Sequence, residues 1–470
     1  MADRRKQSGH MRIPSMKKAD IAAKARLYAA LLFFALALML FLSVLRASIF
    51  TEVSEDKKIW FELSFLFLAA ITAEMLVSYL KQPFVMVLLI VGVAVSPSAI
   101  GVIYPILSGA ANALLAQTPF SLPTEPPVLV GTGGLVMIFA KLGAILLLFK
   151  IGLHSETRKI FNMKNLVIAA CGVIVPFLGG YLFAIAGGHD FYYAMFLGAA
   201  LTATSVGVTV AVLEELRIMQ SDMAQALLGA AVIDDILALL VLSFVVQAPS
   251  GAGAGAFFAL ASIAGTAFVF VAGGILLGKF VVENGFDAMV EGGKGGSRGF
   301  LAMLMYLLFY AYVAEFIGLS AIVGAFVAGI TMGYSRKVEE VQGMFYPLEA
   351  LFTPVFFISL GLLVDVNALA ANWLPILAIT AIAIITKIIG CGAGAYACGV
   401  KARDSLAIGV GMIPRGEIAL IIGLYGLTAL TPSGAPVLGA AEYATIASMA
   451  FLTTIIAPAA MQAAAKAGRR

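Results

Sequence analysis

Two adjacent carboxylates in the middle of an apolar stretch constrain this chain more than any other feature. Asp234 and Asp235 lie within Met223 to Ala248 (MAQALLGAAVIDDILALLVLSFVVQA), which is otherwise almost wholly apolar and long enough to cross a bilayer as a helix. At about 1.5 Å per residue, the pair falls about 17 Å from the start of that helix, near the midplane of a hydrocarbon core about 30 Å thick.

A carboxylate at this depth costs about 2.5–3.5 kcal/mol, so both acids need polar partners or a polar cavity. Because neighbouring side chains on a helix point in different directions, about 100° apart, the two acids need partners on two sides. The stretch therefore predicts a site for cations or protons. The alternative is a buried ion pair that only fastens helices together.

Composition predicts an all-α polytopic membrane protein. Of the 470 residues, 61% are hydrophobic and only 12% are charged, and the mean hydropathy is +1.02, which leaves no stretch for a soluble domain. We expect a basic cytoplasmic tail at 1–26, a single membrane domain at 27–464 and a cytoplasmic C-terminus at 465–470.

Apolar runs divide the membrane domain into fourteen expected spans, near 27–45, 60–80, 84–103, 132–152, 163–186, 191–214, 222–248, 254–278, 298–316, 318–335, 346–364, 372–399, 404–430 and 437–464. Lys and Arg gather in alternate loops, which are the cytoplasmic ones by the positive-inside rule. The long segment from Ile103 to Gly131, on the other side, has no basic residue. We therefore expect both termini in the cytoplasm.

Fourteen spans divide into two sets of seven, about 27–248 and 254–464, and an odd number per set inverts the second relative to the first. The sixth span of each set is interrupted midway. The first, Tyr192 to Leu213, holds Thr204 and Ser205, whose side chains can bond backbone groups or coordinate an ion.

The second interrupted span, Leu406 to Leu427 (LAIGVGMIPRGEIALIIGLYGL), holds Pro414, Arg415 and Glu417. Pro414 removes a helix donor and clashes with the preceding turn. Two discontinuous helices in corresponding positions put helix ends and free carbonyls at the midplane, which indicates a transport site. The alternative is a pair of kinked helices packed by small residues.

Lys387 also lies near the centre of an apolar span, where a buried ammonium needs an anion. We expect one of the two aspartates to be that anion. The other charges within spans are assigned no function, since each can snorkel or pair near an interface. They are Lys141, Lys150, Glu74, Glu315 and Glu349.

Five motifs occur in order along the chain: ATSVGVTV, GAAVIDDILAL, FFISLGLLVD, TKIIG and GMIPRGE. Together they resemble the bacterial sodium/proton antiporters of the cation:proton antiporter superfamily, with the NhaA-like inverted-repeat fold. The resemblance begins near residue 60 and covers almost all of the chain after it. The span Leu27 to Leu45 looks additional to the common antiporter core.

The resemblance implies a Na⁺ and proton site at Asp235, and a salt bridge that Asp234 exchanges with Lys387. It also implies crossed unwound segments at Thr204-Ser205 and at Pro414 to Glu417. Arg415 and Glu417 would offset the helix-end charges there. A homodimer in the bacterial inner membrane is implied, with a mobile core domain that slides against a dimerisation domain.

The expected function is secondary active exchange of a monovalent cation, Na⁺ first, for protons, by alternating access and with net charge movement. The alternatives are K⁺/H⁺ exchange, or Na⁺-coupled symport of an organic solute by a similar fold. An intramembrane aspartyl protease is disfavoured, because adjacent aspartates on one helix diverge. We expect membrane lipid around the chain, no enzymatic activity, cofactor or nucleic-acid partner, and no nucleotide-binding regulatory domain.

Overall fold

The computed structural model describes residues 55–80, 82–114, 116–117, 122–126, 129–130, 134–153, 162–247, 254–286, 296–431 and 434–467. The expected basic tail at 1–26 and first span at 27–45 lie outside these residues. Within the described ranges the chain is helical, with a single isolated bridge, between Leu430 and Pro436.

The helices follow the expected spans closely. Eight helices in the described ranges are long and apolar enough to cross a membrane, and five shorter apolar helices accompany them. The elements are α2 Glu55–Leu80, α3 Phe84–Ala94, α4 Pro97–Leu114, α5 Gly134–Leu153, α7 Met163–Ala186, α8 Phe191–Ala200, α9 Val206–Glu215, α10 Asp222–Gln247, α11 Ala254–Val281, the π-helical turn η2 Val282–Phe286, α13 Gly296–Phe316, α14 Ala321–Met332, α15 Val338–Leu362, α16 Val366–Ala371, α17 Trp373–Ala397, α18 Ala402–Gly411, α19 Glu417–Thr428 and α20 Ala440–Ala467.

Both interrupted spans are discontinuous helices, as expected. The first consists of α8 and α9, separated at 201–205, and the second of α18 and α19, separated at 412–416. The helix α10, which carries both aspartates, runs unbroken beside them.

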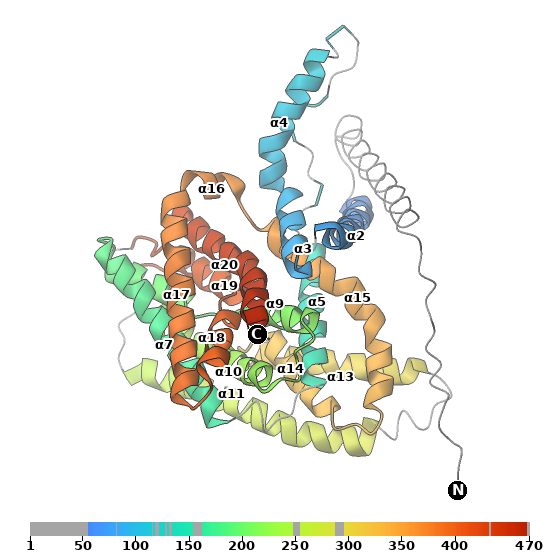
Figure 1. Cartoon of the computed structure of the whole chain (residues 1–470), viewed down its shortest axis with the longest axis vertical. Coiled ribbons are helices and arrows are strands. Elements are labelled where there is room, and N and C mark those ends of the chain that lie inside the picture. The colour runs from blue at the N-terminus through green and yellow to red at the C-terminus, as the bar shows by residue number, and fades with distance from the viewer. Residues whose placement is uncertain are drawn as a thin grey trace.

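One expected span was placed wrongly. The run at 84–103 is broken at Val95 and Ser96, where the Ser96 hydroxyl accepts a hydrogen bond from Ala99 N (3.1 Å) and α4 begins at Pro97. The helix α4 then continues to Leu114 and projects from the body of the molecule (Figure 1). The segment after Ile103, expected as a loop, therefore starts as helix.

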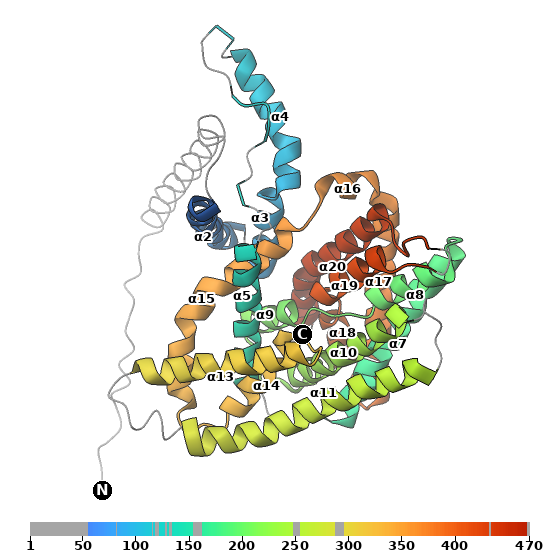
Figure 2. The same ribbon diagram turned by 180° about the vertical axis from the view of Figure 1, so that it is seen from behind.

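The helices form two groups that stand side by side in Figure 1 and, from behind, in Figure 2. We call α7–α10 and α17–α20 the site group, and α2, α3, α5, α13, α14 and α15 the scaffold group. The long helix α11 runs across one end of the molecule, beneath both groups. It contacts α10 of the site group and α14 of the scaffold group.

Within each group, helices approach so closely that only glycine fits between them. In the scaffold group, Gly361 of α15 packs against Gly92 of α3, and a Cβ on Gly361 would meet Leu89 O and the Cα of Gly92. In the site group, Gly180 of α7 packs in the same way against Gly198 of α8. Such contacts leave no room for adjustment and make each group internally rigid.

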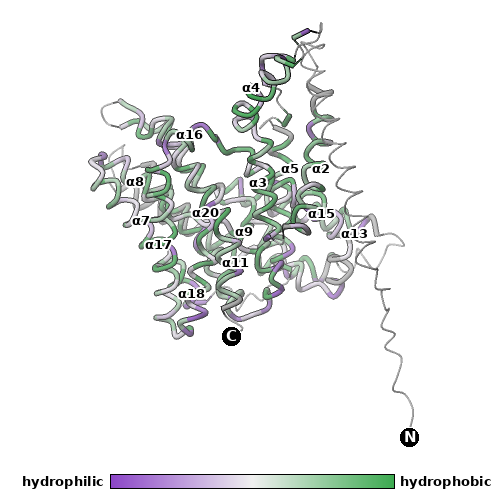
Figure 3. The backbone as a smooth tube through the Cα atoms, turned by 45° about the horizontal axis from the view of Figure 1, so that its top comes forward, coloured by the Kyte–Doolittle hydropathy of each residue, from purple (hydrophilic) through white to green (hydrophobic). Residues whose placement is uncertain are grey.

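The outer faces of the bundle are apolar. Leu182 of α7, Phe268 of α11 and Phe309 of α13 are more than half exposed, and Figure 3 shows hydrophobic residues along most of the helices. A soluble protein of this size would bury such side chains, whereas lipid tails are a suitable solvent for them. The chain is therefore a multi-pass membrane protein.

We expect Gly361→Val to destabilise the scaffold group, because the new side chain cannot be placed without separating α3 from α15. Overpacking of this kind costs about 1–3 kcal/mol. Gly109→Ala in α4, where a Cβ meets nothing within 4 Å, is the matched control and should be neutral or slightly stabilising. The midpoint of thermal unfolding in detergent measures both, and an unchanged midpoint for Gly361→Val would contradict this packing.

Candidate ion site at two crossed helix breaks

The two helix breaks lie against each other. Ser205 N donates to Pro414 O (2.8 Å), and the hydroxyl of Thr209, one turn into α9, donates to Gly411 O (2.7 Å). Gly416 packs onto Ser205, since a Cβ on Gly416 would lie 2.9 Å from that of Ser205. Each break thus satisfies polar backbone groups of the other, which is the condition for irregular backbone inside a membrane.

Arg415 is almost completely buried beside the second break. Its guanidinium donates to Met412 O (3.3 Å), at the C-terminal end of α18, and to Ala383 O in α17 (3.1 Å). Carbonyls at a helix C-terminus carry partial negative charge, which a cation stabilises. Glu417, expected beside it, begins α19, and its side chain lies outside the described atoms.

Lys387 of α17 and Asp234 of α10 form an ion pair from which solvent is excluded. The Nζ atom of Lys387 lies 2.9 and 3.1 Å from the two carboxylate oxygens of Asp234, and both side chains are fully buried. The same ammonium donates to Gly172 O of α7 (2.8 Å) and to Thr202 O in the first break (2.7 Å). All of its donors therefore have acceptors, as a buried charge requires.

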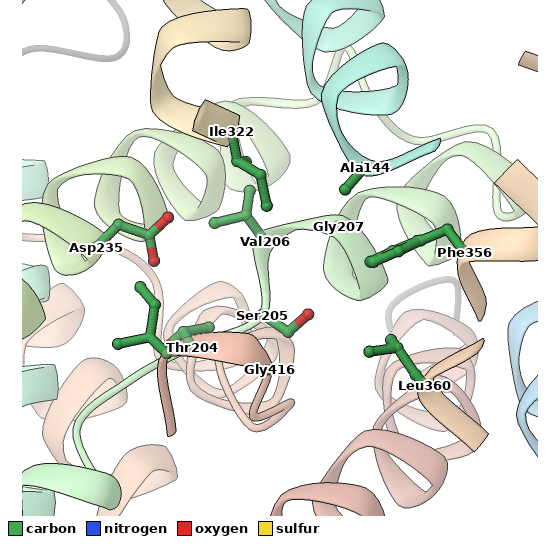
Figure 4. A pocket seen from close by; sticks show the side chains of 11 residues that line it. Ala144, Thr204, Ser205, Val206, Gly207, Asp235, Ile322, Phe356, Leu360 and Gly416 are labelled. Atoms are coloured by element: carbon green, nitrogen blue, oxygen red, sulfur yellow. The ribbon is translucent and has the colours of Figure 1, made fainter. Parts of the chain in front are cut away.

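Asp235 faces the other way, into a pocket between the two groups. The pocket has a volume of about 20 Å³, little more than a water-sized sphere occupies. Figure 4 shows the Asp235 carboxylate near Thr204 and Val206, with Phe356 and Leu360 across the pocket. The lining consists of Ala144, Thr204, Ser205, Val206, Gly207, Asp235, Ile322, Phe356, Leu360, Gly416 and Ile418.

The structure thus brings together the residues that the sequence singled out, but gives the two aspartates different surroundings. Sequence reasoning missed the carbonyl of Gly172, which no side-chain pattern reveals, and the scaffold residue Ile322. Phe356 and Leu360 lie in the FFISLGLLVD motif, which is the signal that could have identified them as pocket-lining residues.

The sequence of this chain is similar to those of known cation/proton antiporters. Residues 63–467 match the family described as sodium/hydrogen exchanger, transmembrane. The Na⁺/H⁺-K⁺ antiporter GerN of Bacillus cereus is 33% identical over 85% of this chain and 94% of its own length. The high-affinity Na⁺/H⁺ antiporter NhaS3 of Synechocystis is 34% identical, over 73% of this chain and 72% of its own.

A solved structure shows the same fold. The sodium proton antiporter MjNhaP1 of Methanocaldococcus jannaschii superimposes with a TM-score of 0.60, covering 88% of this chain and 98% of its own, at 15% identity. Three findings lead to one conclusion: the family match over most of the chain, the 33% identity to GerN over 85% of this chain, and the two crossed helix breaks. This chain belongs to the sodium/hydrogen exchanger family and has the inverted-repeat fold of its antiporters.

Proposed function

We propose that this chain exchanges a monovalent cation, Na⁺ first, for protons across the bacterial inner membrane. One observation carries the proposal: the carboxylate of Asp235 faces a pocket at two crossed helix breaks, between two internally rigid groups of helices. The names of the relatives, which include both Na⁺/H⁺ and Na⁺/H⁺-K⁺ antiporters, support exchange and keep K⁺ as the alternative cation.

Cation and proton would compete for the same oxygens. A bare Na⁺ needs oxygen ligands to replace its water, and the Asp235 carboxylate, the hydroxyls of Thr204 and Ser205 and the backbone at the breaks offer them. A proton on Asp235 removes the negative charge that attracts the cation. Binding of either ligand therefore displaces the other, which is the chemical requirement of an exchanger.

The size of the pocket favours an ion over an organic solute. A volume of about 20 Å³ is of the size of a single small ion, whereas pockets for organic ligands are typically about 300–1,000 Å³. The apolar walls from Ile322, Phe356 and Leu360 offer no polar group that would recognise a solute. These features favour antiport over Na⁺-coupled symport.

Movement between the groups would provide alternating access. At the pocket the ring of Phe356 from the scaffold group rests on Gly207 of the site group, 3.3 Å from where a Cβ would lie. This contact joins a side chain to a smooth backbone surface, unlike the backbone contacts within each group, so the two surfaces can slide. The shift would expose Asp235 to one side of the membrane at a time.

We also propose that both termini lie in the cytoplasm and that the chain forms a homodimer. The alternation of basic loops supports cytoplasmic termini, and the resemblance to the antiporters supports a homodimer. In a dimer of this kind the scaffold groups of two copies would hold each other in place. The site group of each copy would then move against a fixed partner.

Asp235→Asn should abolish exchange while the protein still folds, because the amide keeps the shape but cannot carry the charge or the proton. Asp222→Asn, at the exposed first turn of the same helix, is the matched control and should keep near wild-type exchange. The assay adds Na⁺, Li⁺ or K⁺ in turn to everted vesicles that contain a pH-sensitive dye. Near-normal proton movement by Asp235→Asn would refute this role, and no response of the unmodified chain to any cation would refute the function.

We expect the exchange to move net charge. If cation binding displaces a proton from Asp235 and also releases Lys387 from Asp234, the lysine can give up a proton, and more protons than cations cross in each cycle. An imposed membrane potential, without ion gradients, should then drive proton movement in proteoliposomes that contain Na⁺.

The variant Asp234→Asn/Lys387→Met locates the second proton. It removes both charges without leaving either one buried and unpaired, so it should remain folded. Its exchange should persist but become insensitive to potential. If a membrane potential of neither sign drives proton movement in the unmodified chain, the charge-moving cycle is wrong. If the potential still drives proton movement in the double variant, Lys387 is not the second proton carrier.

A further inference from the structure

A cluster of charged side chains joins three helices from the two groups. Lys150 of α5 lies 3.0 Å from a carboxylate oxygen of Glu214 in α9 and 2.7 Å from one of Glu349 in α15. Glu214 belongs to the site group, whereas Lys150 and Glu349 both belong to the scaffold group. The bridge to Glu214 therefore crosses between the groups, and the bridge to Glu349 does not.

The same three helices also line the pocket at Asp235. Ala144 of α5, Gly207 of α9 and Phe356 of α15 line it, and each stands six or seven residues along its helix from the charged residue of the cluster. At about 1.5 Å per residue, this offset places the cluster about 10 Å from the pocket.

On all three helices the charged residue lies toward the same end of the molecule, relative to the residue that lines the pocket. Gly143 of α5 packs against Phe352 and Phe356 of α15, and Lys150, further along α5, meets Glu349, which comes earlier in α15. The two helices are thus antiparallel. The charged residues therefore form one layer, displaced from the pocket toward one end of the helices.

A second contact between the groups lies beside the first. Glu215 Oε2 accepts a hydrogen bond from Phe84 N (2.9 Å), at the start of the scaffold helix α3. Two successive acids at the end of α9 therefore hold the scaffold group through different helices. Because α9 begins directly after Ser205 at the ion site, this short helix connects the site to both contacts.

We propose that Glu214 and Glu215 form a latch that closes the pocket at this end and has to leave Lys150 and Phe84 N before the pocket can open there. The inference rests on the proposed alternating access. The Lys150–Glu349 bridge stays intact and gives the lysine a partner in both states.

The exposure of these side chains suits a latch that works in every cycle. The side chains of Lys150 and Glu214 are each 26% exposed and that of Glu349 is 15% exposed. Water therefore reaches the cluster, and Glu214 can be rehydrated when it leaves. A fully buried pair such as Asp234–Lys387 would leave an unpaired charge in an apolar interior on breaking.

Cross-linking tests the latch directly. In a full-length chain in which Cys171, Cys391 and Cys398 are replaced by alanine, Lys150→Cys/Glu214→Cys places one thiol in each group. Lys150→Cys/Glu349→Cys is the matched control, with the same first position and both thiols in the scaffold group. A short bis-methanethiosulfonate reagent links each pair, and a reductant reverses the link.

Linking Lys150→Cys to Glu214→Cys should lower cation/proton exchange in proteoliposomes by about tenfold or more, with recovery on reduction, since the groups can no longer move. The control link within the scaffold group should change exchange less than about twofold. Undiminished exchange by the fully linked first pair, or failure of that pair to link at all, would overturn the latch.

A conformational readout separates failure of the latch from failure of the proposed function. A thiol at Ile322→Cys, in the part of the pocket lining that comes from the scaffold group, reports opening at the end away from the latch. The readout is its rate of labelling by a membrane-impermeant thiol reagent added on that side of the membrane only. Glu214→Gln/Glu215→Gln should lower that rate at least about twofold by favouring the opposite opening, and Glu349→Gln should not. If the unmodified chain exchanges no cation, the proposed function fails and this labelling alone decides the latch: an unchanged rate refutes it.

Discussion

The ammonium of Lys387 is the contact on which the arrangement of the site group depends. It joins the carboxylate of Asp234 in α10, the carbonyl of Gly172 in α7 and the carbonyl of Thr202 at the first helix break. One buried charge thus fixes three elements around α17. Because an unpaired ammonium at this depth is so unfavourable, the helices can pack only in the arrangement that supplies all of these acceptors.

Because of this contact, the two aspartates have different surroundings. Asp234 is held by Lys387 away from the pocket, while Asp235, turned to a different side of the same helix, lines the pocket. The crossed breaks add the second requirement, since Ser205 N and Pro414 O satisfy each other and keep irregular backbone stable beside Asp235. A single isolated carboxylate on an unbroken bundle would have neither a fixed orientation nor nearby backbone oxygens.

The packing of the two groups explains how a rigid site can serve both faces of a membrane. Glycines such as Gly92 and Gly361 fasten helices within a group through their backbones. Between the groups the contacts include the ring of Phe356 on Gly207, the bond from Phe84 N to Glu215 and the half-buried pair of Lys150 with Glu214. Contacts of the second kind can break and re-form without leaving a cavity or a stranded charge.

The sequence alone determined the membrane class, most of the span boundaries within the described residues, the two breaks and the identity of the polar residues between them. These follow from local physics, because an apolar run, a proline or a carboxylate at mid-depth has the same consequence in any bundle. The residues alone left open which aspartate pairs with Lys387, and the motifs named Asp234 only through the family resemblance. Only the tertiary structure decided that Gly172 and Thr202 supply carbonyls to that pair and that Lys150 and Glu214 meet across the two groups. Those contacts join residues far apart in the chain, and no periodicity records the angle at which two helices cross.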